Sequence, residues 1–285
     1  DPFNYNYYGS YLIYESQEEI DDRIGAANYD IGHTFSTGGG GVASLRSVCN
    51  DSRKARGVTG RSNPVGDAFD VDYVAHEIGH QFGGNHTFNG CGGTRNAATA
   101  YEPGSGSTIQ AYAGICGADN LQANSDAIFH SESHAEIISY INGGGACGTT
   151  TALGNAIPTA AAGSDYTIPA ETPFRMVGSG SDADADSLTY LWEERDLGPS
   201  AALAADDDGE IPLFRTFTPT ATPERYLPSL ATLASNTTDN AEKVPEVART
   251  MVWRFTVRDN KGGVDSDDAL VTVSTSAGPF LVTSP

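Results

Sequence analysis

The 285-residue chain is poor in basic side chains, with 16 Lys and Arg against 37 Asp and Glu and a formal net charge of -21. Such an excess of negative charge repels phosphate backbones, so nucleic acid is not an expected partner. Long hydrophobic runs are missing too, because no apolar stretch approaches the roughly 18 residues of a membrane span. The opening Asp1-Pro2-Phe3 does not resemble a basic segment followed by an apolar one. We therefore expect a mature, soluble chain.

Cysteine is scarce, and its four positions all lie in the first half of the chain: Cys49, Cys91, Cys116 and Cys147. No two of them are closer than the 25 positions between Cys91 and Cys116, which excludes a CxxC metal site. An even number of separated cysteines favours two disulfides in a secreted protein, with buried free thiols as the alternative. Four cysteines allow three pairings, and their spacing does not choose among them.

Histidine is rare as well, yet three of the six histidines fall in HEIGHQFGGNH, residues 76–86. His76 and His80 are four residues apart, so on a helix they share one face about 6 Å apart along the axis. Glu77 cannot point the same way, but its longer side chain can reach a water held by a metal ion. Gly83 tolerates a positive φ, which can stop the helix and bring His86 back to the metal.

Three neutral nitrogen ligands with an open fourth position are typical of catalytic zinc, whereas structural zinc sites fill all four positions and favour cysteine. The metal lowers the pKa of its bound water toward about 7, and Glu77 can take the proton as the water attacks a carbonyl. A chance match to five specified residues is on the order of 10⁻⁷ per starting position, so the motif predicts a zinc hydrolase. Unrelated surface histidines on a helix are the alternative.

This spacing, HExxHxxGxxH, resembles the zinc signature of the metzincin metallopeptidases. The wider run VAHEIGHQFGGNHTFNGC is similar to the reprolysin-like and pappalysin-like branches, especially secreted bacterial members with a β-sandwich after the catalytic domain. The resemblance covers about residues 15–150. It implies His76, His80 and His86 as zinc ligands and Glu77 as general base and acid, in agreement with the spacing.

The resemblance also implies a turn beneath the metal, matched here by residues 107–116. Tyr112 matches a tyrosine that in some relatives approaches the metal or donates to the tetrahedral oxyanion, with a packed turn aromatic as the alternative. Gln110 stands where the family usually has methionine, and the only methionines, Met176 and Met251, lie in the second half. We expect Gln110 directly below the zinc ligands, with its amide bonded to backbone in the turn.

Three further expectations come from the resemblance alone. The strand above the cleft, which pairs with an extended substrate through backbone hydrogen bonds, would contain Val42, Ala43, Ser44 and Leu45. Reprolysin-like cysteine placement suggests Cys49 with Cys147 and Cys91 with Cys116. Such catalytic domains usually have more strand and helix before the first histidine than 75 residues supply, so we expect a shortened or processed N-terminal part.

Local patterns predict the elements of the first half. Capping-box spacing at Ser16 and Ser133 predicts helices that start near Gln17 and Ser133, the second ending at Asn142. Strands are expected over residues 29–35 and 42–48, and a helix over 70–82. The buried side of that helix is expected to consist of Val71, Val74, Ala75, Ile78 and Phe82.

The composition changes to Thr, Ala, Pro and Gly over residues 148–160, which predicts a linker. Beyond it, residues 188–193, 252–258 and 269–274 alternate apolar and polar side chains between turns rich in Asp, Gly and Pro. The chain is therefore predicted to contain a metzincin-like catalytic domain of mixed α/β (α+β) class at 1–150. An all-β, immunoglobulin-like sandwich is predicted at 151–285.

Acidic clusters lie in the second half. Asp182, Asp184 and Asp186 resemble a calcium loop of β-sandwich domains such as polycystic-kidney-disease-like ones, with a solvated turn as the alternative. The clusters at 206–208 and 265–268 are expected to be solvated loops, and His33, His130 and His134 to be structural or exposed.

Together these features predict a secreted zinc endopeptidase that acts on proteins or peptides and needs Zn²⁺, with Ca²⁺ as a second expected ion. The alternative is a catalytically weak or inactive protein of the metzincin fold whose β-sandwich serves as a binding or adhesion module. The intact His76, Glu77, His80 and His86 favour the enzyme.

Overall fold

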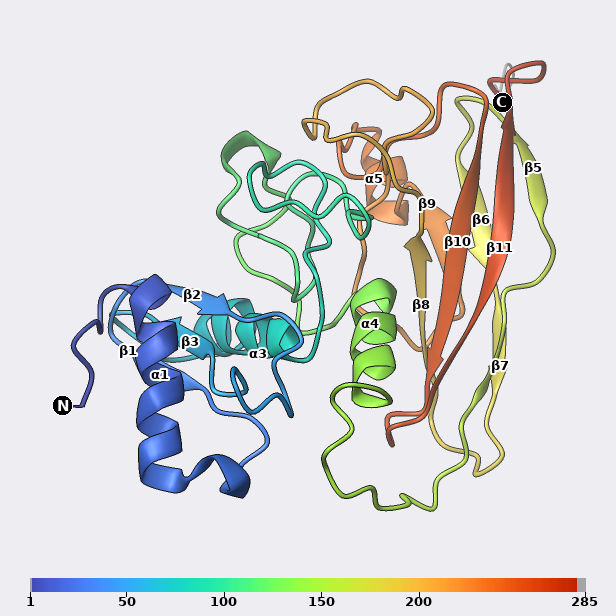
Figure 1. Cartoon of the computed structure of the whole chain (residues 1–285). Helices are drawn as coiled ribbons and strands as arrows, with labels where there is room; N and C mark the ends of the chain where they lie inside the picture. The colour runs from blue at the N-terminus through green and yellow to red at the C-terminus, as the bar shows by residue number, and fades with distance from the viewer. Residues whose placement is uncertain (1, 281–285) are drawn as a thin grey trace. The chain divides into compact units, whose positions relative to one another are not determined.

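The computed structural model describes residues 2–280, and their contacts divide the chain into two units that are described separately here (Figure 1). The first unit contains the residues up to His86, Thr108–Tyr112 and Asn124–Thr151. The second contains Thr87–Ser107, Ala113–Ala123 and the residues from Ala152 onward. None of the helices formed by residues 2–280 is both long and apolar enough to cross a membrane.

The first unit contains a three-stranded sheet in the order β1-β3-β2. The strands are β1 (Thr34–Ser36), β2 (Gly40–Ala43) and β3 (Gly57–Gly60). β1 pairs with β3 in parallel and β2 pairs with β3 antiparallel. Within residues 2–280 no strand pairs with the outer side of β2, so this edge has backbone groups available for an added strand.

Helix α1 (Gly9–Ile24) packs against this sheet, followed by a short 3₁₀ turn, η1 (Ala26–Asn28). Leu12 and Ile13 of α1 form a small buried core with Val58 of β3. The prediction that the helix starts near Gln17 was wrong, because the helix begins at Gly9, about two turns earlier, where it buries Leu12 and Ile13. Ser16 is not a cap: its hydroxyl donates to the carbonyl of Ala55 at 2.7 Å.

A continuous helical run carries the first two histidines of the motif. It consists of α2 (Asp67–Phe69), a π-helical turn η2 (Asp70–Ala75) and α3 (His76–Gln81). The predicted apolar buried side was wrong, because the buried residues of α3 are His76, Glu77, Gly79 and Gln81. The polar side chains of the motif therefore face the interior of the unit, as expected for a binding site and not for a hydrophobic core. Gly83 has φ +103°, so the predicted helix stop at a positive-φ glycine is confirmed.

Helix α4 (Ser131–Ile141) completes the first unit. It begins two residues before the predicted start, and its cap is His130, whose Nδ1 accepts the backbone N–H of Glu132 at 3.1 Å. The Tyr140 hydroxyl, near the end of α4, bonds to the carbonyls of Arg46 and Val48, both at 2.7 Å. The Cys49–Cys147 disulfide suggested by the resemblance is confirmed just beyond the helix.

The second unit is built mainly from strands, with the short helix α5 (Leu230–Ser235) and a 3₁₀ turn, η3 (Gly117–Asp119). Its strands are β4 (Thr159–Ala161), β5 (Tyr166–Pro169), β6 (Phe174–Val177), β7 (Ser179–Ser181), β8 (Thr189–Glu194), β9 (Glu224–Leu227), β10 (Arg249–Arg258) and β11 (Val264–Ser274). The main sheet has the order β5-β11-β10-β8, and β4-β7 and β6-β9 form two smaller pairs. Long β10 and β11 run side by side in Figure 1.

The three predicted stretches of alternating residues lie in β8, β10 and β11. Their inward residues form one buried core in which Trp192, Trp253 and Phe255 are each at most 2% exposed. The Cys91–Cys116 disulfide, also suggested by the resemblance, lies in this unit. The predicted domain limits at residues 150 and 151 stay a prediction.

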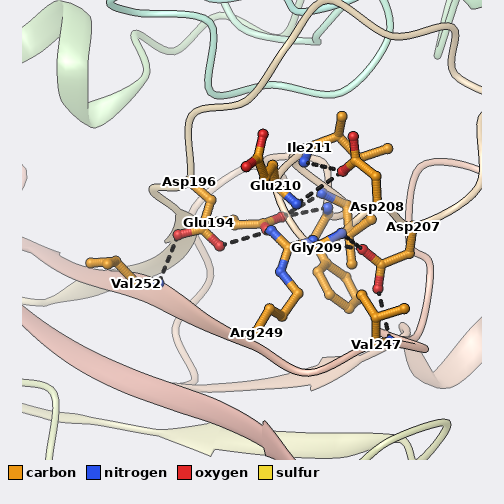
Figure 2. Close-up of polar contacts among 12 residues, drawn as sticks. Glu194, Asp196, Asp207, Asp208, Gly209, Glu210, Ile211, Val247, Arg249 and Val252 are labelled. Carbon is orange, nitrogen blue, oxygen red and sulfur yellow. Dashed lines mark hydrogen bonds and ion pairs between the residues drawn. The ribbon is translucent and has the colours of Figure 1, made fainter.

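A buried group of charges, here called the arginine cluster, lies where β8 ends and β10 begins: Arg249, Glu194, Asp196 and Asp207 (Figure 2). The Arg249 guanidinium lies 3.0 Å from Asp207, 3.1 Å from Asp196 and 3.6 Å from Glu194. The expectation that 206–208 is a solvated loop was wrong for Asp207, whose side chain is 1% exposed. A carboxylate is buried there because it has both a guanidinium and backbone N–H groups to bind.

Candidate metal centre

Three histidine side chains, here called the histidine cluster, meet at one point of the first unit: His76, His80 and His86. The Nε2 atoms of His76 and His80 are 3.0 Å apart, those of His80 and His86 3.1 Å, and those of His76 and His86 3.3 Å. Neighbouring turns of α3 supply the first two, and the turn at Gly83 supplies the third.

The other ring nitrogens hold two of these imidazoles in one orientation. Nδ1 of His76 lies 2.7 Å from the Ile109 carbonyl oxygen, and Nδ1 of His80 lies 2.6 Å from the Gly84 carbonyl oxygen. A carbonyl only accepts, so Nδ1 of each ring carries the proton and donates it. The Nε2 lone pairs are then free of protons and face one another, which is the tautomer that a metal ligand needs.

Burial favours the neutral form of His76 and His80. Burial and the nearby His80 and His86 hold the pKa of His76 well below its usual value. Burial, followed by the charge of His86, lowers the pKa of His80 to about 4. Ring nitrogens that converge at this range repel one another unless a proton or a metal ion lies between them.

The residues fit a zinc ion. Zn–N bonds of about 2.1 Å at tetrahedral angles place ligand nitrogens about 3.4 Å apart, close to the observed separations. Neither a carboxylate nor a thiol joins these three groups among residues 2–280, so the protein side of the site has three neutral nitrogen ligands. This donor set leaves a fourth position for water or substrate.

Glu77 is buried at the start of α3, beside the edge strand β2. A Cβ atom on Gly41 of β2 would collide with the Glu77 carboxyl group, so the glycine makes room for it. Burial alone raises the pKa of Glu77 to about 8. A cation held by the histidine cluster would lower that pKa again, because a nearby positive charge favours the carboxylate.

Tyr112 lies against the histidine cluster. Its ring centroid is 4.6 Å from that of His86 and 5.6 Å from that of His76. The structure therefore brings this residue to the three histidines, although nothing in the geometry tests its predicted role toward an oxyanion.

Gln110 is buried beneath α3, so its predicted position below the ligands is confirmed. Its Nε2 donates to the Gly84 carbonyl at 3.2 Å and lies 3.0 Å from Nδ1 of His80. The amide does bond to backbone, but in the turn that carries His86 rather than in its own turn. Its Oε1 is buried without a hydrogen-bond partner and packs where a Cβ on Gly79 would have to lie.

The amino-acid sequence decides which family these residues represent. Residues 1–142 match the family model of the reprolysin-like metallo-peptidases, family M12B. This part of the chain belongs to that family. No curated protein matches the chain. Family membership and the histidine cluster together support a zinc metallopeptidase that acts on proteins or peptides.

The predicted substrate strand of this reprolysin-like part coincides with the free edge. Val42 and Ala43 belong to β2, and Ser44 follows it with its N–H bonded inward to the Arg56 carbonyl at 2.8 Å. Leu45 is 37% exposed. The role of all four residues in substrate binding stays a prediction.

The acidic triplet in the second unit brings three carboxylates together. One oxygen each from Asp182, Asp184 and Asp186 lies within 4.8 Å of the others. Oδ1 of Asp182 accepts the backbone N–H groups of Asp184 at 2.8 Å and Asp186 at 3.1 Å, which closes the loop. Calcium binding there stays a prediction.

Sequence reasoning missed three groups that shape the site. They are the Ile109 carbonyl on His76, the space at Gly41 for Glu77, and the Glu136 carboxylate on Asn85. The two backbone effects leave no mark on the side-chain pattern. Glu136 has the spacing of a capping box after Ser133, whereas its carboxylate binds Asn85, 51 positions earlier.

Two of the remaining histidines, His33 and His130, are structural residues, as expected. His33 links α3 to β3. Its Nδ1 lies 2.8 Å from Oε1 of Gln81 in α3, and its Nε2 lies 2.7 Å from Oγ1 of Thr59 in β3. Burial lowers its pKa. His130 is buried at the cap of α4.

Proposed function

We propose that the chain is a secreted zinc-dependent endopeptidase whose reprolysin-like part cleaves internal peptide bonds. The observation that carries this proposal is the convergence of three histidine Nε2 atoms within 3.3 Å of one another. A metal ion bound at that point would accept all three nitrogens as ligands.

When bound, zinc would polarise the scissile carbonyl and lower the pKa of an attacking water. Glu77 is proposed to take that proton, since it follows His76 directly and is buried at the start of α3. Its burial raises its proton affinity, so the same carboxyl group can then return the proton to the leaving amine. Tyr112, packed against His86 and His76, is proposed to donate to the oxyanion.

The substrate is proposed to be an extended peptide segment that adds as a strand to the free edge of β2. The edge is unpaired in the structure, and the Glu77 carboxyl group packs beside Gly41 of the same strand. Pairing through main-chain groups of Val42 to Leu45 would hold peptides of many sequences, because backbone hydrogen bonds do not depend on side chains.

The other finer proposals concern the second unit and the compartment. Its paired sheets and shared core support an immunoglobulin-like β-sandwich, and the clustered carboxylates of Asp182, Asp184 and Asp186 support bound calcium. Two disulfides are common in extracellular proteins and support secretion.

The test is cleavage of a mixed peptide library by the zinc-loaded chain, read by mass spectrometry, with Glu77→Ala as the matched control. Wild-type protein should cut internal bonds, and the variant should retain zinc while its rate falls by several orders of magnitude. Zinc-loaded wild-type protein that cuts no peptide would refute the proposed activity and favour a binding role. Equal cleavage by Glu77→Ala would refute the role of Glu77.

A further inference from the structure

The third histidine reaches the cluster through a short turn, Gly83 to Asn85, whose two glycines contribute no side chains. Backbone bonds fix its beginning: the N–H of Gly83 donates to the His80 carbonyl and that of Gly84 to the Gly79 carbonyl, both at 2.9 Å. The Gly84 carbonyl accepts from Nδ1 of His80 at 2.6 Å. Asn85, the residue between Gly84 and His86, is held by a side chain from outside this turn.

A single carboxylate holds Asn85 at two points. The backbone N–H of Asn85 donates to Oε2 of Glu136 at 2.8 Å, and its side-chain Nδ2 donates to Oε1 of the same residue at 2.5 Å. Hydrogen bonds to a charged acceptor are stronger than neutral ones, and two parallel bonds fix orientation as well as distance. Asn85 therefore can neither shift nor rotate without breaking a bond to Glu136.

Glu136 is itself held in place, because it lies in the middle of α4. The Tyr140 hydroxyl, one turn later, ties the same helix to the Arg46 and Val48 carbonyls. The N–H of Arg46 in turn donates to the His80 carbonyl at 3.0 Å, so this anchor returns to α3 itself. Glu136 thus links Asn85 to an element whose position relative to the first two ligands is already fixed.

From this geometry we infer that Glu136 is a positioning residue for the metal centre: through Asn85 it holds His86 at the point where the three Nε2 atoms converge. The inference rests on the proposed zinc site. His86 is covalently joined to Asn85, and its Nε2 lies 3.1 Å and 3.3 Å from those of His80 and His76. Without Glu136 the end of a turn containing two glycines would be free to move, and a ligand that must be ordered on binding binds metal more weakly.

The test measures metal binding instead of catalysis. Zinc affinity is determined by competition with a chelating dye, and the cobalt-substituted protein gives a visible absorption spectrum that reports ligand geometry. Glu136→Ala should weaken zinc binding about 10- to 100-fold, the range found for groups that orient metal ligands. It should also change the cobalt spectrum.

Two matched variants separate positioning from charge. Glu136→Gln should recover most of the affinity, because its amide oxygen accepts the Asn85 N–H while a flipped Asn85 amide accepts from its Nε2. Glu18→Ala removes the same charge from an exposed position on α1 and should leave affinity and spectrum unchanged. Asn85→Ala changes the other partner without altering α4, and it should weaken zinc binding as Glu136→Ala does.

The outcomes are distinct. Wild-type protein that binds neither zinc nor cobalt would overturn the proposed function and this inference with it. Wild-type protein that binds zinc, with unchanged affinity and spectrum in both Glu136→Ala and Asn85→Ala, would overturn this inference alone. The same follows if Glu136→Ala lowers only the melting temperature of the metal-free protein, or if Glu136→Gln binds zinc as weakly as Glu136→Ala.

Discussion

The histidine cluster of the first unit and the arginine cluster of the second both contain buried polar groups, but only in the arginine cluster do opposite charges face one another. Arg249 lies within 3.6 Å of three carboxyl groups (Figure 2). Backbone N–H groups of Leu213 and Phe214 donate to Oε2 of Glu194, and that of Val252 donates to Oδ1 of Asp196. In the histidine cluster three acceptor nitrogens face one another instead.

This difference separates a binding site from a structural one. Burial of a polar group is unfavourable unless the protein supplies its partner, so a cluster that is complete within the chain needs no ligand. A cluster of like groups that the chain does not balance indicates a partner from outside. Burial of charge alone would not have distinguished the two clusters.

Removal of zinc should have the largest effect, because it affects the cluster that depends on a ligand. Stripping the metal should abolish peptide hydrolysis and lower the free energy of unfolding by about 4 kcal/mol, if free zinc had been near 1,000 times its Kd. Rate measurements and urea unfolding with and without a zinc-selective chelator check this, and added zinc should restore both. An unchanged rate and midpoint would show that the histidine cluster holds no functional metal.

Arg249→Met tests the cluster that is complete by itself. Removal of the guanidinium leaves three carboxyl groups, among them the fully buried Asp207, without a counter-charge, so the free energy of unfolding should fall by about 3–5 kcal/mol. Arg254→Met is the control on the same strand, because its ion pair with Asp268 is partly exposed and should contribute less than about 1 kcal/mol. Equal urea midpoints for the two variants would contradict the comparison.

The acidic triplet, Asp182, Asp184 and Asp186, resembles the histidine cluster in one respect: it brings three like groups within 4.8 Å of one another. If calcium binds there, millimolar calcium should raise the melting temperature of the full chain by a few degrees, because a ligand of the native state stabilises it. Asp186→Asn should reduce that rise, as it removes one ligand charge. An identical calcium response in wild type and variant would indicate a solvated turn.

Glu194→Gln should reveal a smaller, pH-dependent effect. Burial, with the charge of Asp196, raises the pKa of Glu194 to about 8, and burial also raises the pKa of Asp196. The folded state therefore keeps a proton on Glu194 that the unfolded chain releases above about pH 4.3. The stability that this proton adds to the folded state is fully present below that pH and is lost as the pH rises toward 8. Glutamine imitates the protonated form, and its unfolding free energy should fall less between pH 5 and 8. Parallel curves for the two proteins would show that Glu194 does not titrate in this range.

The same contrast explains how much the sequence could predict. Ligand spacing on a helix is local, so His76, His80, Glu77 and the stop at Gly83 follow from 3.6-residue geometry and glycine's tolerance of positive φ. The strands β8, β10 and β11 likewise follow from period-two alternation. In each case neighbours in the chain carry the information.

What could not be predicted depends on partners distant in the chain. Glu136 has capping-box spacing after Ser133, but the helix starts earlier and the carboxylate bonds to Asn85. Asp207 lies in a run of three aspartates typical of a loop, yet Arg249, 42 positions later, makes its burial favourable. Neither contact leaves a periodic pattern, because the partner is chosen by the tertiary fold.

Gln110→Met should have the smallest effect, and it tests whether the position beneath the histidine cluster needs shape or polarity. The variant loses the donor to the Gly84 carbonyl, which still accepts from Nδ1 of His80. It also removes Oε1, a buried acceptor without a partner, whose burial costs about 1–3 kcal/mol. These two changes oppose each other, and the side chains have similar length, so unfolding free energy should change by less than about 1 kcal/mol.

Zinc content and hydrolysis should also stay near wild type in Gln110→Met. Gln110→Ala is the matched control, because it removes the same amide but leaves a cavity under α3, and truncations of buried side chains of this size cost about 2–5 kcal/mol. If both Gln110→Met and Gln110→Ala bound zinc more weakly than wild type, zinc binding would depend on the hydrogen bond from the Gln110 amide to the Gly84 carbonyl. In that case the polarity beneath the ligands would be part of the metal site.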